Sequence, residues 1–369
     1  MVVLTVALPN IDIVFKQLAS TLINRSSRAN AILIIKDDTD KTFKIKEYSL
    51  SSEVEEDSAL YTAENLQYIK DTWLGLPGRV TVVRIDKTDG NIGDALAIIA
   101  GLNTTGWVGI AEGATVSNAD EDALAIWTKQ MEQQKKTFKS VVFNPTAPPD
   151  CKHVVVLNNS EVIFNDTRVE QTGDKFIPSL LGYLAGANVE KGTTYLEMKN
   201  LKSVTQPADI NETLNTGQLV LINDEGKVKI GLGINSLTTL DEDHTEDEKY
   251  IEIVEAQDMM LDDIRSNFKN NYINKYKNKL DNQIIFISAV NTYLKELEGQ
   301  GVLDDEFTNK ADIDVDAQRK AWITSNADAA NWSDTKVRQN AYKRAMFLNG
   351  NVKILFSMTD LNFTINMQQ

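Results

Sequence analysis

The chain has 369 residues, of which 42% are hydrophobic and 25% are charged, and its formal net charge is −15. This composition is typical of a soluble globular protein with one large domain or two to three smaller ones, and it contains no apolar run near the roughly 18–20 residues that span a bilayer. The acidic charge argues against general binding to nucleic acid or anionic membranes. The apolar opening MVVLTVAL lacks a basic segment and runs into Pro9–Asn10, so we expect no signal peptide. The single cysteine, Cys151, excludes an intramolecular disulfide and suits a reducing cytoplasm.

Both ends of the chain show the alternating pattern of a half-buried strand, whose side chains point to opposite faces in turn. Neither end has an obvious hairpin partner beside it, and the backbone of a strand needs hydrogen-bonding partners. Two hypotheses stay open: terminal strands that pair within the monomer, or arms that add strands to neighbouring subunits. The apolar positions are Ile11, Ile13 and Phe15 at one end, and Leu361, Phe363, Ile365 and Met367 at the other.

Between these ends, the first part of the chain predicts strands with one helix among them. Residues 31–36 read as a buried strand, and the alternating residues 41–48 read as its antiparallel neighbour. Residues 59–74 have helical apolar spacing, and a strand is predicted over 79–85.

The middle of the chain alternates helix and strand, which indicates an α/β layer with some parallel pairing. The predicted helices are 91–102 and 119–138, and the predicted strands are 106–111, 140–143, 153–157 and 162–164.

The C-terminal half predicts mainly helices. A turn over 223–226 marks a hairpin between strands 219–222 and 227–230. Asparagines recur every three or four residues from 267 to 282, which predicts either a polar helix face or a break within 270–280. The predicted helices are 176–187, 251–268, 283–297 and 334–348.

Few residues suggest catalysis. Cys151 and His153 are two apart in a strand pattern and could share a face, but no orienting group or oxyanion donor is identifiable, so we expect a structural role. His244 lies in a stretch, 241–263, that holds eleven Asp or Glu and one Lys. A cation site is conceivable there, but the spacing matches no EF-hand, and we favour a solvated acidic loop leading into an acidic helix N-terminus. The segment from Gly231 to Ser236 lacks the lysine of a phosphate loop and reads as a turn.

At residues 251–303 the sequence resembles the C-terminal region of contractile phage tail sheath proteins, most closely those of defective prophages and R-type tailocins from low-GC Gram-positive bacteria. Further segments resemble the same family in the same order: LPNIDIVF, LLGYLAGANVEKGTTY, GLGINSLTT and NVKILFSMTDLNFTINM. The resemblance spans nearly the whole chain and is weakest over 91–170. The family often has glycine where this chain has Asn274, a residue that tolerates left-handed geometry.

The resemblance implies a mixed α/β (α+β) fold: a sheath core of mixed sheet and helices, an inserted outer α/β lobe, and extended β-strand arms. It also implies that N- and C-terminal arms complete a small sheet in neighbouring subunits. The expected segments are an N-terminal arm over 1–20, core over 21–90, the independent outer lobe over 91–170, core over 171–348 and a C-terminal arm over 349–369.

As function, the resemblance implies a structural subunit that forms stacked hexameric rings and a helical polymer around an inner tube, and that contracts to drive the tube through a bacterial envelope. The implied partners are further copies of the chain, the tube protein, and baseplate and tail-terminator proteins, with no nucleic acid, membrane, metal or cofactor and no catalytic residues. The particle would assemble in the bacterial cytoplasm and be released as a phage tail or a headless bacteriocin, two outcomes that the sequence leaves open.

A tube-attachment helix is expected in the C-terminal part of the subunit. The predicted helix 334–348 carries four cations and a single Asp, although the chain as a whole is acidic, and Lys336 and Lys343 are seven residues apart on nearly the same face. The alternative is an ordinary solvated basic face. The predicted attachment residues are Lys336, Arg338, Lys343 and Arg344.

Two other classes remain as alternatives. The first is an α/β nucleotide-binding enzyme that uses the layer over 79–165, although no nucleophile, metal cluster or phosphate loop supports it. The second is another tail component, such as a tube or baseplate protein.

Overall fold

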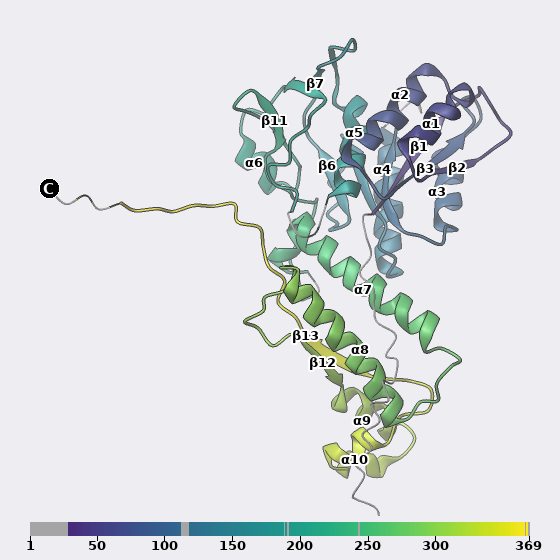
Figure 1. The fold of residues 1–369 in the computed structure, drawn as a ribbon, viewed down its shortest axis with the longest axis vertical. Helices are drawn as coiled ribbons and strands as arrows, with labels where there is room; N and C mark the ends of the chain where they lie inside the picture. The colour runs from purple at the N-terminus through teal and green to yellow at the C-terminus, as the bar shows by residue number, and fades with distance from the viewer. Residues whose placement is uncertain are drawn as a thin grey trace, which may run out of the picture. The chain divides into compact units, whose positions relative to one another are not determined.

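The computed structural model describes residues 29–111, 118–187, 189, 192–242, 244–365 and 367, so the predicted N-terminal strand at 11–16 lies outside the described residues. The chain forms two units, which we describe separately (Figure 1). The sheet unit contains the described residues of 25–263, 298–304 and 353–369. The described part of the helix unit is 264–297 and 305–352.

A six-stranded sheet organises the sheet unit, with the strand order β2-β3-β1-β4-β5-β6. All pairs are parallel except β2 with β3, and Leu33 of β1 lies between Val82 of β3 and Gly109 of β4. The predicted alternation of strand and helix is thus confirmed as parallel pairing. The strands are β1 (Asn30–Lys36), β2 (Ile45–Tyr48), β3 (Arg79–Ile85), β4 (Gly106–Ile110), β5 (Lys139–Phe143) and β6 (Val154–Leu157).

The pairing predicted between 31–36 and 41–48 is wrong, because β2 pairs with β3 and not with β1. The two edges of β1 are occupied by the parallel strands β3 and β4, and the interior of β1 is buried. Only the last residue of β2, Tyr48, is buried, and a half-exposed strand suits the edge of a sheet.

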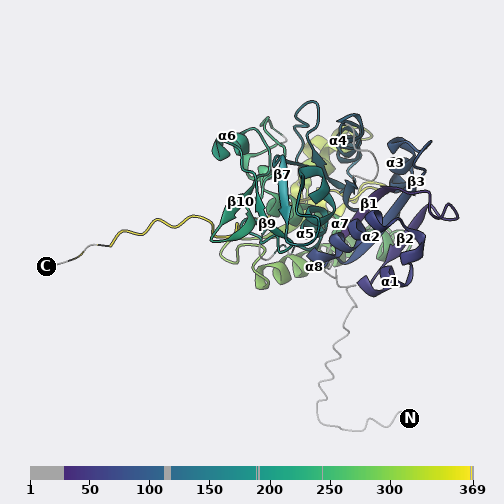
Figure 2. The same cartoon turned by 90° about the horizontal axis from the view of Figure 1, so that it is seen from above.

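Alternate residues of each strand pack on opposite faces of the sheet, as the strand period requires. Leu33 and Val82 belong to one core with residues of α2 and α5, whereas Ile34 and Val83 belong to a second core with residues of α3 and α4. Figures 1 and 2 show these helices beside the strands. The helices of the sheet unit are α1 (Ser51–Glu56), α2 (Ala63–Thr72), α3 (Ile92–Ala100), α4 (Asn118–Gln133), α5 (Ile177–Gly186) and α6 (Ile210–Asn215).

The sheet continues across the boundary predicted at residue 90, because β4 pairs directly with β1. Strands from 91–170 therefore share one sheet with strands from 21–90. Whether this stretch faces outward in an assembly stays a prediction.

Smaller sheets complete the sheet unit. One has the order β8-β7-β9, with β7 (Glu161–Phe164), β8 (Glu170–Thr172) and β9 (Leu201–Val204). The predicted hairpin is confirmed as β10 (Leu221–Asp224) and β11 (Lys227–Ile230). Its turn residues Glu225 and Gly226 both have positive φ, the backbone that matches the twist of a two-residue hairpin.

The long helices α7 (Ile251–Asn271) and α8 (Leu280–Gly299) confirm two predicted helices and the break within 270–280. The chain passes from the sheet unit to the helix unit within α7. Asn274, in the connection between the two helices, has a φ of 64°, so it adopts the left-handed backbone that glycine would have favoured there. The remaining elements of the helix unit are β12 (Lys310–Ile313), α9 (Val315–Ile323), α10 (Asp334–Gln339) and β13 (Leu348–Asn351).

The predicted helix over 334–348 is wrong beyond residue 339. Ser333 caps the start of α10, and the carbonyl of Asn340 at its end accepts a hydrogen bond from the indole of Trp322. Lys343 has a positive φ, and Leu348 already pairs with Ile313 in the β12–β13 sheet. Tertiary contacts and strand pairing therefore determine the conformation after residue 339, although the spacing of apolar and charged residues is helical.

Short 3₁₀ turns occur at Ser58–Leu60, Trp73–Gly75, Gly173–Phe176, Glu246–Lys249 and Ala327–Asn331. Within the described ranges, no helix combines the length and the hydropathy that crossing a membrane requires.

Candidate functional site

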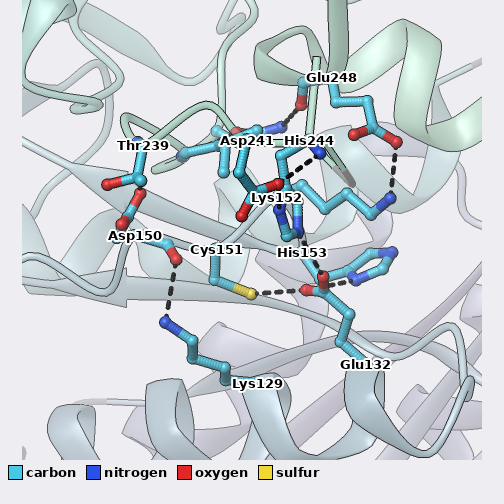
Figure 3. A network of polar contacts seen from close by, with 12 residues as sticks. Lys129, Glu132, Asp150, Cys151, Lys152, His153, Thr239, Asp241, His244 and Glu248 are labelled. Carbon is cyan, nitrogen blue, oxygen red and sulfur yellow. Dashed lines mark hydrogen bonds and ion pairs between the residues drawn. The ribbon is translucent and has the colours of Figure 1, made fainter. Parts of the chain in front are cut away.

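Three places in the structure carry the residues that the sequence singles out: a buried polar cluster, the C-terminal arm, and the basic segments of the helix unit. The buried cluster surrounds His153 (Figure 3). Glu132 of α4 accepts a hydrogen bond from the Cys151 thiol at 2.9 Å and lies 3.0 Å from His153 Nδ1. Cys151 and His153 thus share a carboxylate, and the predicted structural role fits their burial.

The cluster continues onto the first turns of α7. His153 Nε2 lies 3.1 Å from Asp258, whose carboxylate also accepts a hydrogen bond from Lys139 Nζ at 2.9 Å. Lys139 is 3.3 Å from Glu255, which accepts a second hydrogen bond from the Trp107 indole at 2.8 Å. One face of α7 is therefore held by side chains at the amino ends of β4 and β5 and just before β6.

The electrostatics of the cluster favour paired charges. Burial lowers the pKa of His153, but the carboxylates of Asp258 and Glu132 outweigh it and raise the pKa to about 9, so the imidazolium can donate to both. Burial raises the pKa of Glu132, but its hydrogen bonds from His153 and Cys151 bring it down to about 2. Burial and the adjacent Glu132 raise the pKa of the Cys151 thiol well above its usual range. Cys151 therefore stays a thiol at neutral pH and is a poor nucleophile.

The acidic stretch 241–263 is only partly the solvated loop that we expected. Glu248, Asp258 and Asp263 are buried, and Glu248 accepts a hydrogen bond from Lys152 at 2.7 Å. His244 lies 2.8 Å from Asp241. No group of three or more metal-ligating side chains occurs among the residues that the structure describes. Sequence reasoning did not find the partners of these acidic residues, because the partners are far away in the chain. The one available signal was that acidic positions 255, 258 and 262 recur on one helical face.

The C-terminal arm has a fixed base and an exposed outer part. At the base, the Leu355 amide donates to Val302 at 3.0 Å, the Phe356 ring packs edge-on against Tyr250, and the Ser357 hydroxyl donates to Glu252 at 2.6 Å. Beyond Ser357, residues 358–365 and 367 belong to no strand (Figure 2). The apolar side chains of the predicted strand are exposed, at 87% for Leu361, 75% for Phe363, 69% for Ile365 and 90% for Met367.

The β12–β13 sheet of the helix unit has two unlike edges. On the β12 edge, the side-chain amide of Asn291 on α8 accepts from the Ala311 amide at 2.7 Å and donates to the Ala311 carbonyl at 3.1 Å. On the β13 edge, Gly350 lies opposite Ala311, so its N–H and C=O also point away from the ladder. No hydrogen bond to the backbone of Gly350 or Leu348 on this edge is found among the described residues.

The two faces of this small sheet also differ. Ala311 and Ile313 are buried on one face. The other face borders a mostly polar groove of about 300 Å³. The residues that line this groove are Phe307, Thr308, Lys310, Asp312, Asn349, Gly350 and Asn351.

The four predicted attachment residues do not share one helix face. Lys336 lies over the Trp332 ring at 4.6 Å, and Arg338 donates to Asp312 at 2.8 Å, both from α10. Lys343 and Arg344 lie beyond the helix and are exposed. The expected alignment of Lys336 with Lys343 is therefore wrong, because it assumed a helix through residue 348.

Comparisons with known proteins agree with the sequence resemblance. Residues 243–368 match the family described as the phage tail sheath C-terminal domain. The tail sheath protein of Clostridium phage phiCD119 is 28% identical over 375 residues, covering 98% of this chain and 99% of that protein.

Two solved structures share the fold, which confirms the predicted mixed α/β class. The helical sheath of the anti-feeding prophage in its contracted state has a TM-score of 0.68 at 14% identity, covering 99% of this chain and 100% of the other. The sheath tail protein Lin1278 from Listeria innocua has a TM-score of 0.64 at 14% identity, covering 90% and 96%. Residues 243–368 thus match a phage tail sheath C-terminal domain, and the chain over nearly its whole length is similar to a tail sheath protein.

Proposed function

We propose that this protein is the sheath subunit of a contractile tail, that it polymerises as stacked hexameric rings around an inner tube, and that contraction of the polymer drives the tube through a bacterial envelope. The observation that carries the proposal is the exposed, alternating C-terminal arm together with a sheet edge that can accept it. The arm exposes four large apolar side chains, and an isolated strand in water would gain nothing from exposing them.

The arm has one apolar and one polar face, and these match the two faces of the sheet at the open edge of β13. In an added strand, side chains of one face lie beside Leu348 and Gly350, and those of the other face lie beside Asn349 and Asn351. The arm has Leu361, Phe363, Ile365 and Met367 on one face and Asn362, Thr364 and Asn366 on the other. The apolar side chains of the arm would extend the face on which Ala311 and Ile313 are buried. The asparagine and threonine side chains would lie over the polar groove on the other face.

Gly350 supports close approach at this edge. A Cβ at this position would lie 2.9 Å from the Lys310 carbonyl, so a larger residue would disturb the β12–β13 pairing. The absent side chain also leaves the covered face open beside the edge, where a large apolar group of an added strand can pack. The donor would be the arm of another copy, so that each subunit is linked to its neighbours by main-chain hydrogen bonds.

A structural, non-enzymatic role is part of the proposal. The cysteine and histidine that most resemble catalytic groups are buried and satisfied by Glu132 and Asp258. Energy for motion would come from subunit contacts that differ between two packings of the polymer, through heterologous interfaces that build open helical arrays. The further partners would be the tube, baseplate and tail-terminator proteins, and the particle would assemble in the cytoplasm before release.

The test changes one face of the arm at a time. Replacing Phe363 and Ile365 by serine removes apolar burial in the added strand and should abolish cylinders in electron micrographs of the purified protein. The matched control replaces Asn362 and Thr364 by serine, which keeps the apolar face and should leave cylinders.

Deleting residues 358–369 should give the same loss while retaining a folded subunit by circular dichroism, because the base of the arm at 355–357 remains. Normal cylinders from the deletion variant would contradict the proposed role of the arm. Failure of the unaltered protein to form cylinders would contradict the proposed function itself.

A further inference from the structure

One buried carboxyl group of the sheet unit differs from the others. Glu121 lies in the first turn of α4 and is only 1% exposed. Neither of its carboxyl oxygens has a hydrogen-bond partner among the described residues, and no cation pairs with it there. By contrast, the buried Asp258 accepts a hydrogen bond from Lys139, and the buried Glu248 accepts one from Lys152. Because an ionised carboxylate without a partner is costly to bury, the protonation state of Glu121 matters for the fold.

The strands β4 and β5 pair at their amino ends and separate at their carboxyl ends. The last paired residues are Val108 and Ser140, whereas β5 stays paired with β6 as far as Phe143. The Ser140 amide donates to the His153 carbonyl on the β6 side. Successive amides of a strand point to alternate sides, so the Phe143 amide, three residues further on, points to the β4 side. At that level β4 no longer pairs with β5.

Glu121 lies at this separation of the two strands. Helix α4 follows β4 in the chain, so its first turn lies at the carboxyl end of the parallel sheet. The Phe143 amide is close enough to favour the ionised form of the Glu121 carboxyl group. Two turns further along α4, the Thr128 hydroxyl donates to Ser140 at 2.9 Å and fixes the helix on β5. The carboxyl group therefore fills space beside β5 that β4 has left.

The surroundings of Glu121 favour its neutral form. Burial raises the pKa of Glu121 well above its ordinary value, and the backbone amide at the end of β5 lowers it only partly. The carboxylates of Asp174, Asp120 and Asp122 raise the pKa further. The start of a helix favours a negative charge only modestly. The ammonium group of Lys36, at the end of β1, lies 3.8 Å from Asp120 and forms no ion pair with Glu121.

We infer that Glu121 fills the separation between β4 and β5 as a neutral carboxylic acid, and that loss of its proton loosens the first turn of α4 from the sheet. A carboxylate at this position has to reach water or stay buried without a cation. The later turns of α4 are held by apolar core residues such as Leu124 and Met131, so the opening is local. The sheet unit thus contains a proton-dependent joint between α4 and β5.

The test uses the full-length chain and the variant E121Q, which has a similar shape and stays neutral at every pH. Below pH 4.5, the ordinary pKa of a glutamate, Glu121 is protonated in both the folded and the unfolded chain. Above it, only the unfolded chain loses this proton, so stability falls as the pH rises until the folded group ionises too. Between pH 5 and pH 6 in urea unfolding, the unfolding constant of the unaltered protein should rise about eightfold relative to that of E121Q. The control E170Q, at an exposed residue of β8, should show the pH dependence of the unaltered protein.

Two further measurements observe the proton and the opening directly. At pH 7, the infrared spectrum of the unaltered protein minus that of E121Q should contain the carbonyl band of a protonated acid. Asp71 and Glu255, whose pKa values burial also raises, contribute equally to both spectra. Hydrogen exchange over residues 118–124, corrected for its intrinsic rate, should lose protection between pH 6 and pH 8 in the unaltered protein and keep it in E121Q.

The three measurements can each contradict a part of this inference. A missing infrared band, or parallel stability curves of the unaltered protein and E121Q, would show that Glu121 is ionised in the fold and would overturn the inference. Equal protection of residues 118–124 in the two proteins at pH 8 would overturn the loosening of α4.

Discussion

The two units treat charge in opposite ways. The sheet unit buries charged side chains and pairs them, as in the chain of contacts from Glu132 through His153 and Asp258 to Lys139. The helix unit keeps its cations at the surface, where several have no acidic partner among the described residues. Buried pairs fix one geometry strongly because breaking them leaves an uncompensated charge, whereas exposed charges contribute little to folding and remain available to a partner.

The largest expected effect is in the sheet unit. Lys139→Met leaves Glu255 and Asp258 buried without their shared cation, and we expect a loss of about 3 kcal/mol or more in the free energy of unfolding. Urea unfolding followed by tryptophan fluorescence would measure it, since Trp107 contacts the same cluster. Lys202→Met, at an exposed lysine of β9, is the control and should change stability by under about 0.5 kcal/mol. Equal effects of the two variants would remove the contrast between buried and exposed charges.

The pH dependence of stability tests whether the buried charges of the sheet unit stabilise the fold. The pKa of His153 is raised from 6.5 to about 9 in the folded protein. Its contribution is therefore fully present below about pH 6.5 and is lost as the pH rises through about 9, with a magnitude of roughly 3 kcal/mol.

His153→Gln should flatten the stability curve in this pH window. The variant also removes a hydrogen bond that lowers the pKa of Glu132 and of Asp258, so the two proteins are compared between pH 6.5 and 9, above the ordinary pKa of a carboxyl. A variant whose curve runs parallel to that of the unaltered protein from pH 6.5 to 9 would show that His153 is not charged in the fold.

Cys151→Ser should have a smaller effect. A serine hydroxyl can still donate to Glu132, so we expect a loss of about 1 kcal/mol in stability and unchanged contraction in electron micrographs. The same expectation does not extend to His153→Ala, which would leave Glu132 and Asp258 without their shared donor. Loss of contraction in a stable Cys151→Ser protein would argue for a chemical role of the thiol.

The smallest effect is expected in the helix unit. Arg338→Gln removes an ion pair with Asp312 whose side chains are both partly exposed, so solvent screens it and the loss should be about 0.5 kcal/mol, detectable as a small shift of the thermal midpoint. Lowering the salt concentration should enlarge the difference slightly. A loss as large as that of Lys139→Met would mean that the surface charges of the helix unit do hold the fold.

Much of the sheet could be predicted from the sequence, since β1, β3 and β6 are short apolar runs whose burial determines their structure. The charged cluster could not, because Lys139 and Asp258 are 119 residues apart and neither has a local signal of its partner. The helix predicted over 334–348 failed for a related reason: its cations fit a helical period, but strand pairing at Leu348 and the backbone of Lys343 decide the conformation. The C-terminal arm was predicted as a strand, and this stays a prediction because residues 358–365 belong to no strand in the subunit.

The side chain of Asn291 has a consequence for the subunit before assembly. A two-stranded sheet with both edges open is a template on which strands can add without end, and such growth leads to aggregates. By occupying the Ala311 backbone, the side-chain amide of Asn291 closes one edge of the β12–β13 sheet and leaves the Gly350 edge as the place for the proposed arm. If the arm of another copy adds at the β13 edge as proposed, strand addition to this sheet would stop after that one strand.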